Sequence, residues 1–196
     1  MRHSGRALMM GMLMAGAGLQ ASTVPERFGV GFQVGAAMPA TQDLSTAAGT
    51  GFNLGAHLNW DLSEDYALRP RLDLMHFGGK HQDVTTPLIQ HIDTQVQGVA
   101  LGAEFLFLFD GPSGVWSFGP GVYAVRWSVK STNRITVGTG SVSASGTSSW
   151  TRPAVGVTVT RRLRRGLELE GRWLFSHYGY QDSLARVITA GIAWRF

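Results

Sequence analysis

The sequence predicts an all-β fold, an eight-stranded antiparallel up-and-down transmembrane barrel. Three observations support this prediction. The N-terminus has the layout of an export signal, eight later segments alternate apolar with small or polar residues, and the connections between those segments alternate in length. The chain of 196 residues has 26 glycines and no cysteine, which suits a single exported domain that is stabilised without disulfides.

The first 21 residues are expected to be a cleaved signal peptide. A basic start is followed by an apolar run from Ala7 to Leu19 and then by the small residue Ala21. The run is shorter than the roughly 20 residues that a helix needs to cross a bilayer, so it favours an export signal over a membrane anchor. We therefore divide the chain into a signal peptide, residues 1–21, and a mature barrel domain, residues 22–196, and expect no further soluble domain.

Eight segments of the mature chain have the period-two pattern of a strand with two different faces. Each is near or above the length of a tilted strand that crosses the hydrocarbon of a membrane. No segment after the signal has the long apolar run of a membrane-spanning helix, and a helical period is hard to find. The expected strands are about 28–38, 51–61, 66–77, 94–109, 115–128, 150–161, 166–178 and 184–196.

The connections between these strands alternate between tight turns and long loops. In outer-membrane barrels the short turns face the periplasm and the long loops face outside, so we expect both chain ends in the periplasm. The third long loop is rich in Ser, Thr and Gly and is expected either to be mobile or to extend its strands as a hairpin. The turns are 62–65, 110–114 and 162–165, and the loops are 39–50, 78–93, 129–149 and the shorter 179–183.

The two faces of the predicted wall differ in chemistry. A soluble β-sandwich would also alternate, so the placement of aromatic residues helps to decide between the two folds. Aromatic side chains gather toward both strand ends, as they do at the two interfaces of a membrane. The outward set includes Phe52, Leu54, Leu58 and Trp60 in the second strand and Val99, Leu101, Phe105, Phe107 and Phe109 in the fourth. One aromatic belt is expected at Phe28, Trp60, Tyr66, Phe109, Trp116, Trp194 and Phe196, and the other at Trp127, Trp150, Trp173, Phe175 and Tyr178.

The inward face carries charges that we expect to pair with one another. An eight-stranded barrel is just wide enough for its side chains to fill, and an unpaired buried charge is strongly destabilising. We therefore expect acids and arginines to plug the lumen, with His57 hydrogen-bonded into the same network. The alternative is a narrow pore whose ion preference these charges set. The predicted lumen charge network is Arg69, Arg71, Asp73, Glu104, Glu168, Glu170 and Arg172.

The last strand carries a resemblance to a known family. Ile188, Ile192 and Trp194 share the parity of a terminal Phe196, and this pattern resembles the C-terminal signature by which outer-membrane barrels are recognised for assembly. With its strand count, loop asymmetry and length, the mature chain resembles the small eight-stranded outer-membrane barrels of the OmpA transmembrane-domain and OmpX type. The resemblance implies a Gram-negative outer membrane, contact with lipid and lipopolysaccharide, the barrel-assembly machinery as a partner during biogenesis, and a monomer without a cofactor.

Three functions suit such a barrel. We favour a structural or surface-interaction role, with a small channel or a carrier for apolar molecules, as in OmpW-type barrels, as the second choice. A lipid A-modifying enzyme is the third, because Ser176-His177-Tyr178 is similar in position to the His-x-Ser motif of the lipid A deacylase barrels. However, Gly179 stands where that family has its nucleophilic serine, and no glutamate follows to orient the histidine. We therefore predict no catalytic residue.

Metal and nucleic-acid binding are not predicted. His76, His81 and His91 lie about the second long loop with Asp83 and Asp93, and they would bind a metal if the loop folded over. Their irregular spacing favours a solvated polar loop instead. The formal net charge of +4 does not indicate nucleic-acid binding, because the basic residues are scattered and form no continuous stripe.

Overall fold

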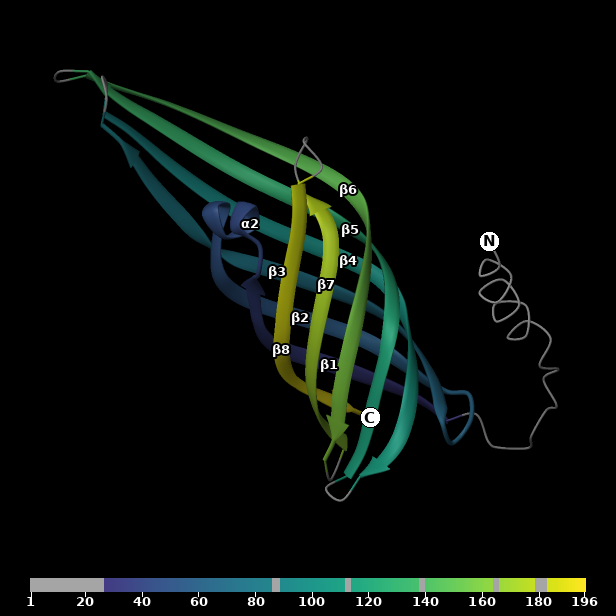
Figure 1. Ribbon diagram of the computed structural model, residues 1–196. Helices are drawn as coiled ribbons and strands as arrows, with labels where there is room; N and C mark the ends of the chain where they lie inside the picture. The colour runs from purple at the N-terminus through teal and green to yellow at the C-terminus, as the bar shows by residue number, and fades with distance from the viewer. Residues whose placement is uncertain (1–26, 86–88, 112–113, 138–139, 164–165, 179–182) are drawn as a thin grey trace, which may run out of the picture.

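The computed structural model describes residues 27–85, 89–111, 114–137, 140–163, 166–178 and 183–196. Eight antiparallel strands follow one another in chain order and close into a barrel, because β1 pairs with β8 as well as with β2 (Figure 1). The predicted fold class is confirmed. The predicted signal peptide lies outside the described residues and stays a prediction. The strands are β1 (Arg27–Pro39), β2 (Ala48–Asp61), β3 (Tyr66–Val84), β4 (Ile89–Gly111), β5 (Gly114–Val137), β6 (Gly140–Arg162), β7 (Leu167–Tyr178) and β8 (Ser183–Arg195).

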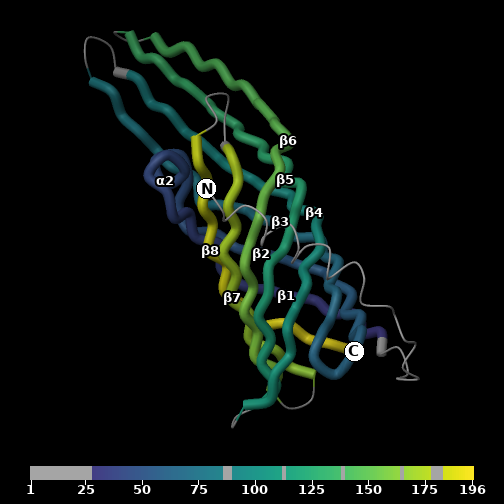
Figure 2. The backbone as a smooth tube through the Cα atoms, turned by 45° about the vertical axis from the view of Figure 1, so that its right-hand side comes forward, coloured from purple at the N-terminus to yellow at the C-terminus, as the bar shows by residue number. Residues whose placement is uncertain are grey.

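Four neighbouring strands continue far beyond the barrel. β3 to β6 have 19 to 24 residues, whereas β1, β2, β7 and β8 have 12 to 14. A tilted strand needs only about 9 to 11 residues to cross a membrane, so the excess projects from one end of the barrel as a four-stranded arm (Figures 1 and 2). We define the arm as residues 80–84, 89–94, 131–137 and 140–146.

The arm corrects one prediction and decides another. Residues 78–93 were expected to form a loop, but most of them continue β3 and β4 as a paired hairpin. Of the two expectations for residues 129–149, the hairpin holds, because β5 and β6 pair without interruption to Val137 and Gly140. The first hairpin could not be predicted because its side chains are mostly polar and lack a period-two apolar face. Its strands are positioned instead by backbone pairing that continues the order of the barrel wall.

A short helix, α2 (Gln42–Ala47), follows β1 and was not predicted. It has only six residues, too few to display a helical period. Leu44 is fully buried and belongs to an apolar cluster with Phe77, Val96 and Trp127. The helix therefore packs Leu44 into the barrel mouth, with Ala47 partly buried against the same cluster. Across the described ranges, no helix is long and apolar enough to span a membrane.

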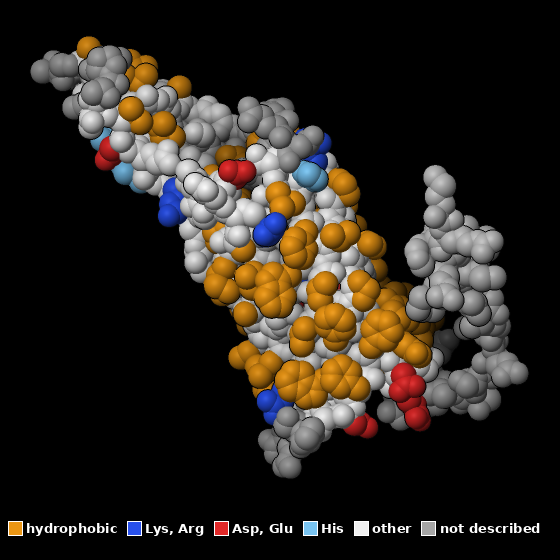
Figure 3. Space-filling model, viewed as in Figure 1, with side chains coloured by type: hydrophobic (Ala, Val, Ile, Leu, Met, Phe, Trp, Pro, Cys, Tyr) orange, Lys and Arg blue, Asp and Glu red, His pale blue; other side chains and the backbone are white. Residues whose placement is uncertain are grey.

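The outer wall of the barrel carries an apolar band (Figure 3). The predicted outward side chains are exposed or half-buried, and Leu101 in the middle of β4 is 63% exposed. Their neighbours along the strand, such as Asn53 and Glu104, are buried in the lumen. A soluble sandwich would turn its apolar face inward, whereas this wall exposes it. The alternative of a soluble sandwich is therefore wrong, and the closed wall is suited to lipid.

Trp127 and Trp150 correct the predicted aromatic belts. Both were placed at the outer interface, but Trp150 packs against the buried apolar cluster, and the side chain of Trp127 is fully buried inside the barrel. The indole ring packs against Phe77, with 6.2 Å between ring centroids, and Nε1 donates a hydrogen bond to Ser176 Oγ at 3.3 Å. Trp127 shares the inward parity of Tyr123 and Val125. Position near a strand end therefore does not by itself put an aromatic residue on the lipid face.

Candidate functional site

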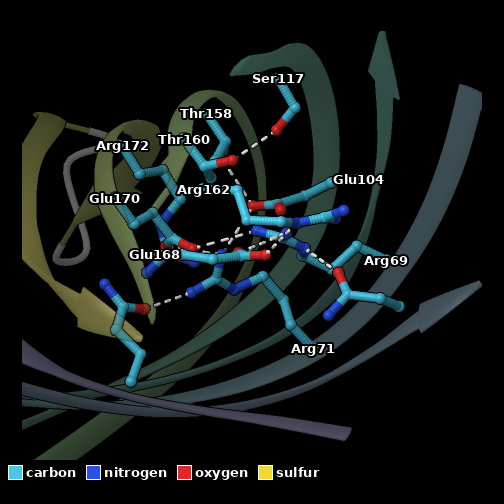
Figure 4. Close-up of polar contacts among 12 residues, drawn as sticks. Arg69, Arg71, Glu104, Ser117, Thr158, Thr160, Arg162, Glu168, Glu170 and Arg172 are labelled. Atoms are coloured by element: carbon cyan, nitrogen blue, oxygen red, sulfur yellow. Dashed lines mark hydrogen bonds and ion pairs between the residues drawn. The ribbon is translucent and has the colours of Figure 1, made fainter. Parts of the chain in front are cut away.

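The lumen holds a layer of buried charge between the short turns and the apolar cluster of the mouth. The structure places all seven residues of the predicted lumen charge network inside the barrel, and none is more than 4% exposed. They project inward from β3, β4 and β7, and Figure 4 shows all of them except Asp73. Those on β3 and on β7 lie at alternate positions along the strand, because side chains on every second residue share one face of a sheet.

Arg71 of β3 is the centre of the layer. Its Nε and Nη2 atoms donate to the two oxygens of Asp73 at 2.8 and 2.9 Å. Its Nη1 atom lies 3.0 Å from Glu104 Oε1 and 2.8 Å from Glu170 Oε1, and Nη2 also donates to Gln33 Oε1 at 2.6 Å. One guanidinium thus contacts three carboxylates on three strands, which suits its planar set of five donors.

Arg69 forms the second part of the layer, nearer the short turns. It donates to Asn59 Oδ1 at 2.6 Å, to Glu168 Oε2 at 2.9 Å and to Glu170 Oε2 at 3.2 Å. Arg162 at the end of β6 adds a contact of 3.2 Å from its Nε to Glu168 Oε1. Arg162 was assigned to a tight turn, so its reach into the lumen was not predicted.

Arg172 of β7 joins the opposite sides of the barrel. Its Nη1 atom lies 2.6 Å from Asp73 Oδ2 on β3, and its guanidinium stacks 5.6 Å above the ring of Tyr123. Tyr123 in turn donates from its hydroxyl to Glu104 at 2.5 Å, and Thr158 donates to the same oxygen at 2.6 Å. Tyr123 and Thr158 were not predicted, because their contacts with Glu104 depend on how three strands are placed beside one another.

Glycines make room for the Tyr123 ring. A Cβ atom at Gly102 would lie 2.3 Å from the ring, and one at Gly121 would lie 2.6 Å from the hydroxyl oxygen. Gly156 on β6 closes the recess, with 3.0 Å between its hypothetical Cβ and the ring. Real Cβ atoms essentially never come closer than 3.0 Å to another atom, and 3.0 Å is itself tighter than most real contacts. The three glycines on β4, β5 and β6 therefore leave the space that the phenol occupies beside Glu104.

The charges of the layer balance. Four arginines, Arg162 included, contact the four carboxylates of Asp73, Glu104, Glu168 and Glu170. Pairing of this kind offsets the large penalty of removing charges from water. The contacts also connect β3 with β4 and β7 across the lumen. Chemically, the arrangement holds the walls together and fills the space between them.

His57 does not take the predicted role. It is buried in the lumen, but among the described residues neither of its ring nitrogens has a hydrogen-bond partner. The ring lies over Gly31, where a Cβ atom would come within 2.1 Å of Nε2. The prediction that His57 is hydrogen-bonded into the charge network is therefore wrong. The ring fills space above a residue that has no side chain.

Ser176 and His177 do not form a nucleophile and base pair. Ser176 points into the barrel, is 3% exposed and accepts the hydrogen bond of Trp127, whereas His177 is exposed on the outer face. Adjacent residues of a strand project to opposite sides of a sheet, so the two side chains are separated by the wall. This geometry does not support the lipid A-modifying alternative.

The C-terminal residues complete the closure of the barrel. Ile188, Ile192 and Trp194 lie opposite Met38, Val34 and Phe32 of β1. The ring of Phe196 packs against Phe32, with 6.4 Å between centroids. All four residues of the predicted assembly signal thus lie on the outer side of the strand that seals the sheet. Their role in assembly stays a prediction.

The fold defines a class of protein, the small eight-stranded transmembrane barrels. No protein-family model and no curated protein matches the chain by sequence, but solved outer-membrane structures share its fold. A major outer membrane protein from Thermus thermophilus has a TM-score of 0.62 at 14% identity, over 87% of this chain and 100% of that one. Ail, the attachment invasion locus protein of Yersinia pestis, has a TM-score of 0.54 at 15% identity, over 86% of this chain and 96% of Ail. The predicted resemblance to small outer-membrane barrels is confirmed at the level of the fold.

Proposed function

We propose that this protein is an integral outer-membrane barrel with a closed lumen, which holds a rigid arm at the cell surface for interaction with other molecules. The observation that carries the proposal is the balanced layer of ion pairs inside the barrel. The outer-membrane location is supported by the apolar outer band and by the solved outer-membrane proteins that share the fold.

Closure of the lumen follows from the way the charges are held. Arg71 contacts carboxylates on three strands, and Arg172 bridges to the opposite wall. An ion in transit would have to separate these pairs, which would leave buried charges without partners. The apolar cluster at the mouth, with Leu44, Phe77 and Trp127 fully buried, adds a second barrier to water.

The arm supports the surface-interaction part of the proposal. It extends from the end of the barrel opposite the short turns (Figure 2), the end that faces outside in barrels of this class. Residues 140–147 of β6 are all exposed, and they are mostly Ser, Thr, Gly and Ala. A polar sheet of this length is suited to pass through the headgroup layer and to present backbone and hydroxyl groups to partners beyond it.

Conductance of the purified protein in planar lipid bilayers tests the closed lumen. We expect no ion-conducting steps from the wild type. The double variant Arg71→Ala/Glu104→Ala removes the centre of the layer and should conduct. The control Asp61→Asn disrupts only the Arg195–Asp61 pair at the barrel end, 2.6 Å long, and should stay silent. Regular, long-lived steps from folded wild type would overturn the proposal and favour a channel.

A further inference from the structure

Two histidines and two aspartates, residue types that can ligate metals, lie together on one face of the arm. His81 and Asp83 of β3 stand directly opposite Asp93 and His91 of β4 in the strand register. Because every second residue of a strand faces the same side, the four side chains form a square with the two histidines on one diagonal. The space-filling view has histidine and acidic side chains side by side on the arm (Figure 3).

The four side chains are already in mutual contact. Asp83 Oδ1 lies 2.9 Å from His81 Nε2 and 2.5 Å from His91 Nδ1. The two imidazole rings stack with 5.7 Å between centroids and 16° between planes. One donor atom from each of His81, Asp83 and His91 can therefore be chosen so that all three lie within 4.8 Å of one another.

We propose that His81, Asp83 and His91 bind a zinc-type divalent transition-metal ion. His81 Nε2, a carboxylate oxygen of Asp83 and His91 Nδ1 supply three ligands, and water takes the open fourth position of a tetrahedral site. Zinc–ligand bonds of about 2.0 to 2.2 Å place neighbouring donors roughly 3.3 Å apart in a tetrahedron. The carboxylate donor of Asp83 needs to move away from each histidine nitrogen by less than about 1 Å to reach this spacing.

Asp93 supports the site without being a ligand. Its Oδ1 atom lies 2.8 Å from Nδ1 of His81, the ring nitrogen that faces away from Asp83. A histidine that binds a metal through one nitrogen usually donates from the other to a carboxylate, which fixes the ring and strengthens the ligand. Asp93 is in the place that this arrangement requires, and this second contact distinguishes the cluster from a chance group of polar residues.

The ligand set favours transition metals over calcium or magnesium. Two imidazole nitrogens and one carboxylate suit zinc, copper or nickel, whereas calcium and magnesium prefer sites built from oxygen. A metal ion and a proton compete for the same ring nitrogens, so binding should weaken as the pH falls. This proposal revises the expectation of a solvated loop, which assumed that residues 78–93 were unpaired.

The position of the site indicates a structural role. The pairing of β3 with β4 is interrupted between His76 and Lys80 and resumes directly before His81. A metal held by both strands would clamp the hairpin at the point where it leaves the barrel wall. His76 lies on the other side of the interruption, where its ring packs against Phe52 and contacts Gln97, so it is a matched control.

Two cations on β5 oppose the binding of a metal. Arg134 stands opposite His91, and Lys130 stands opposite Gln95, one diagonal step from Asp93. Both are exposed, and moderate salt weakens the interaction of exposed charges over a distance of about 10 Å. Their repulsion of a bound metal ion is therefore modest. Replacing Arg134 should increase the affinity for the metal by a few fold, whereas replacing a ligand should decrease it.

Calorimetric titration of the untagged, folded barrel in detergent with zinc chloride tests the site. We expect one saturable site per chain, which is lost in His81→Ala and in His91→Ala. Asp93→Asn should weaken it by about 10- to 100-fold, Arg134→Ala should tighten it, and His76→Ala should leave it unchanged. Calcium chloride should produce no saturable heat. Cobalt chloride gives a second readout, a visible absorption that an equal amount of zinc abolishes.

Two results would overturn the proposal. One is the absence of a saturable zinc isotherm for folded wild type. The other is binding that survives in the double variant His81→Ala/His91→Ala, since zinc would then be held elsewhere on the chain. Folding of each variant is checked by its mobility on an unboiled gel. The replaced side chains are exposed or half-buried and lie outside the lumen, so the barrel itself should form in every case.

Discussion

Arg172 on β7 and Asp73 on β3 meet across the lumen, with 2.6 Å between Nη1 and Oδ2. In the strand order of the closed barrel, β3 and β7 lie on opposite sides. The pair therefore connects two walls that share no backbone hydrogen bonds. It also gives Asp73 a second cation beside Arg71, so that a single carboxylate joins two arginines.

The cross-lumen pair should contribute strongly to stability. We expect Arg172→Ala to lower the free energy of unfolding by about 3 to 5 kcal/mol, the range for breaking a buried ion pair. Arg162→Ala is the comparison, because Arg162 is 31% exposed and Glu168 keeps its contact with Arg69, so the loss should be clearly smaller. Urea unfolding in lipid vesicles measures both. Equal losses would mean that the lumen is hydrated rather than filled.

A charge placed on the apolar band should destabilise the barrel according to depth. Leu101→Arg puts a cation at the middle of β4, where we expect a loss of about 2 to 4 kcal/mol. Val142→Arg, on the arm at 74% exposure, should change the free energy of unfolding by less than about 0.5 kcal/mol. The same urea titration compares them. A tolerated Leu101→Arg would place this part of the wall in water.

Trp127 should behave as a core residue and not as a membrane anchor. Trp127→Ala removes a fully buried ring that packs on Phe77, and we expect a loss of about 3 to 5 kcal/mol. Trp173→Leu, on the outer wall at 48% exposure, leaves an apolar side chain against lipid and should cost clearly less. Thermal unfolding in detergent measures the pair. A larger loss of stability in Trp173→Leu than in Trp127→Ala would mean that Trp127 lies at the membrane interface and not in the core.

The arm should respond to pH through His81. The hydrogen bond to Asp93 and the charge of Asp83 raise the pKa of His81 above its usual value of 6.5, and the hydrogen bond from His91 lowers the pKa of Asp83. The raised pKa means that protonated His81 stabilises the hairpin fully below about pH 6.5. This contribution is lost as the pH rises through the raised pKa.

An NMR titration of the histidine ring protons follows this equilibrium. Asp93→Asn removes the main cause of the shift, so the midpoint of His81 should move down toward 6.5. His91, Lys130 and Arg134 also face the group, and they are unchanged in this variant. An unaltered midpoint would show that Asp93 does not hold the ring.

Much of the fold could be predicted because a membrane barrel imposes strict alternation. The parity that exposes Leu101 and buries Glu104 on β4 is visible in the sequence, and so is the length contrast between turns and loops. The arm was harder to predict, since polar strands such as residues 140–147 have no buried face and so no period-two signal. The predicted place of Trp127 was wrong because the end of a strand suggests a membrane interface, whereas parity decides which side of the wall the ring occupies.

The charged residues of the lumen could be predicted from the sequence, but the ion pairs that they form could not. The seven charged residues lie inward because of parity, but parity does not reveal partners on distant strands. Whether Arg172 contacts Asp73 or a glutamate depends on the stagger of β3 against β7. The role of Tyr123 could not be predicted, because its place depends on Gly102, Gly121 and Gly156 on three strands. The histidine cluster could not be predicted from the sequence, because it depends on the strand register that places His81 opposite Asp93.

Electrophoretic mobility of the protein from isolated outer membranes tests the central claim, a closed barrel in the outer membrane, most directly. Membranes are dissolved in mild detergent, and samples are run with and without boiling. We predict that the protein is found in the outer-membrane fraction and that boiling changes its mobility, because a sealed sheet resists detergent until it is heated. Recovery in the soluble periplasmic fraction, with identical mobility before and after boiling, would contradict the account.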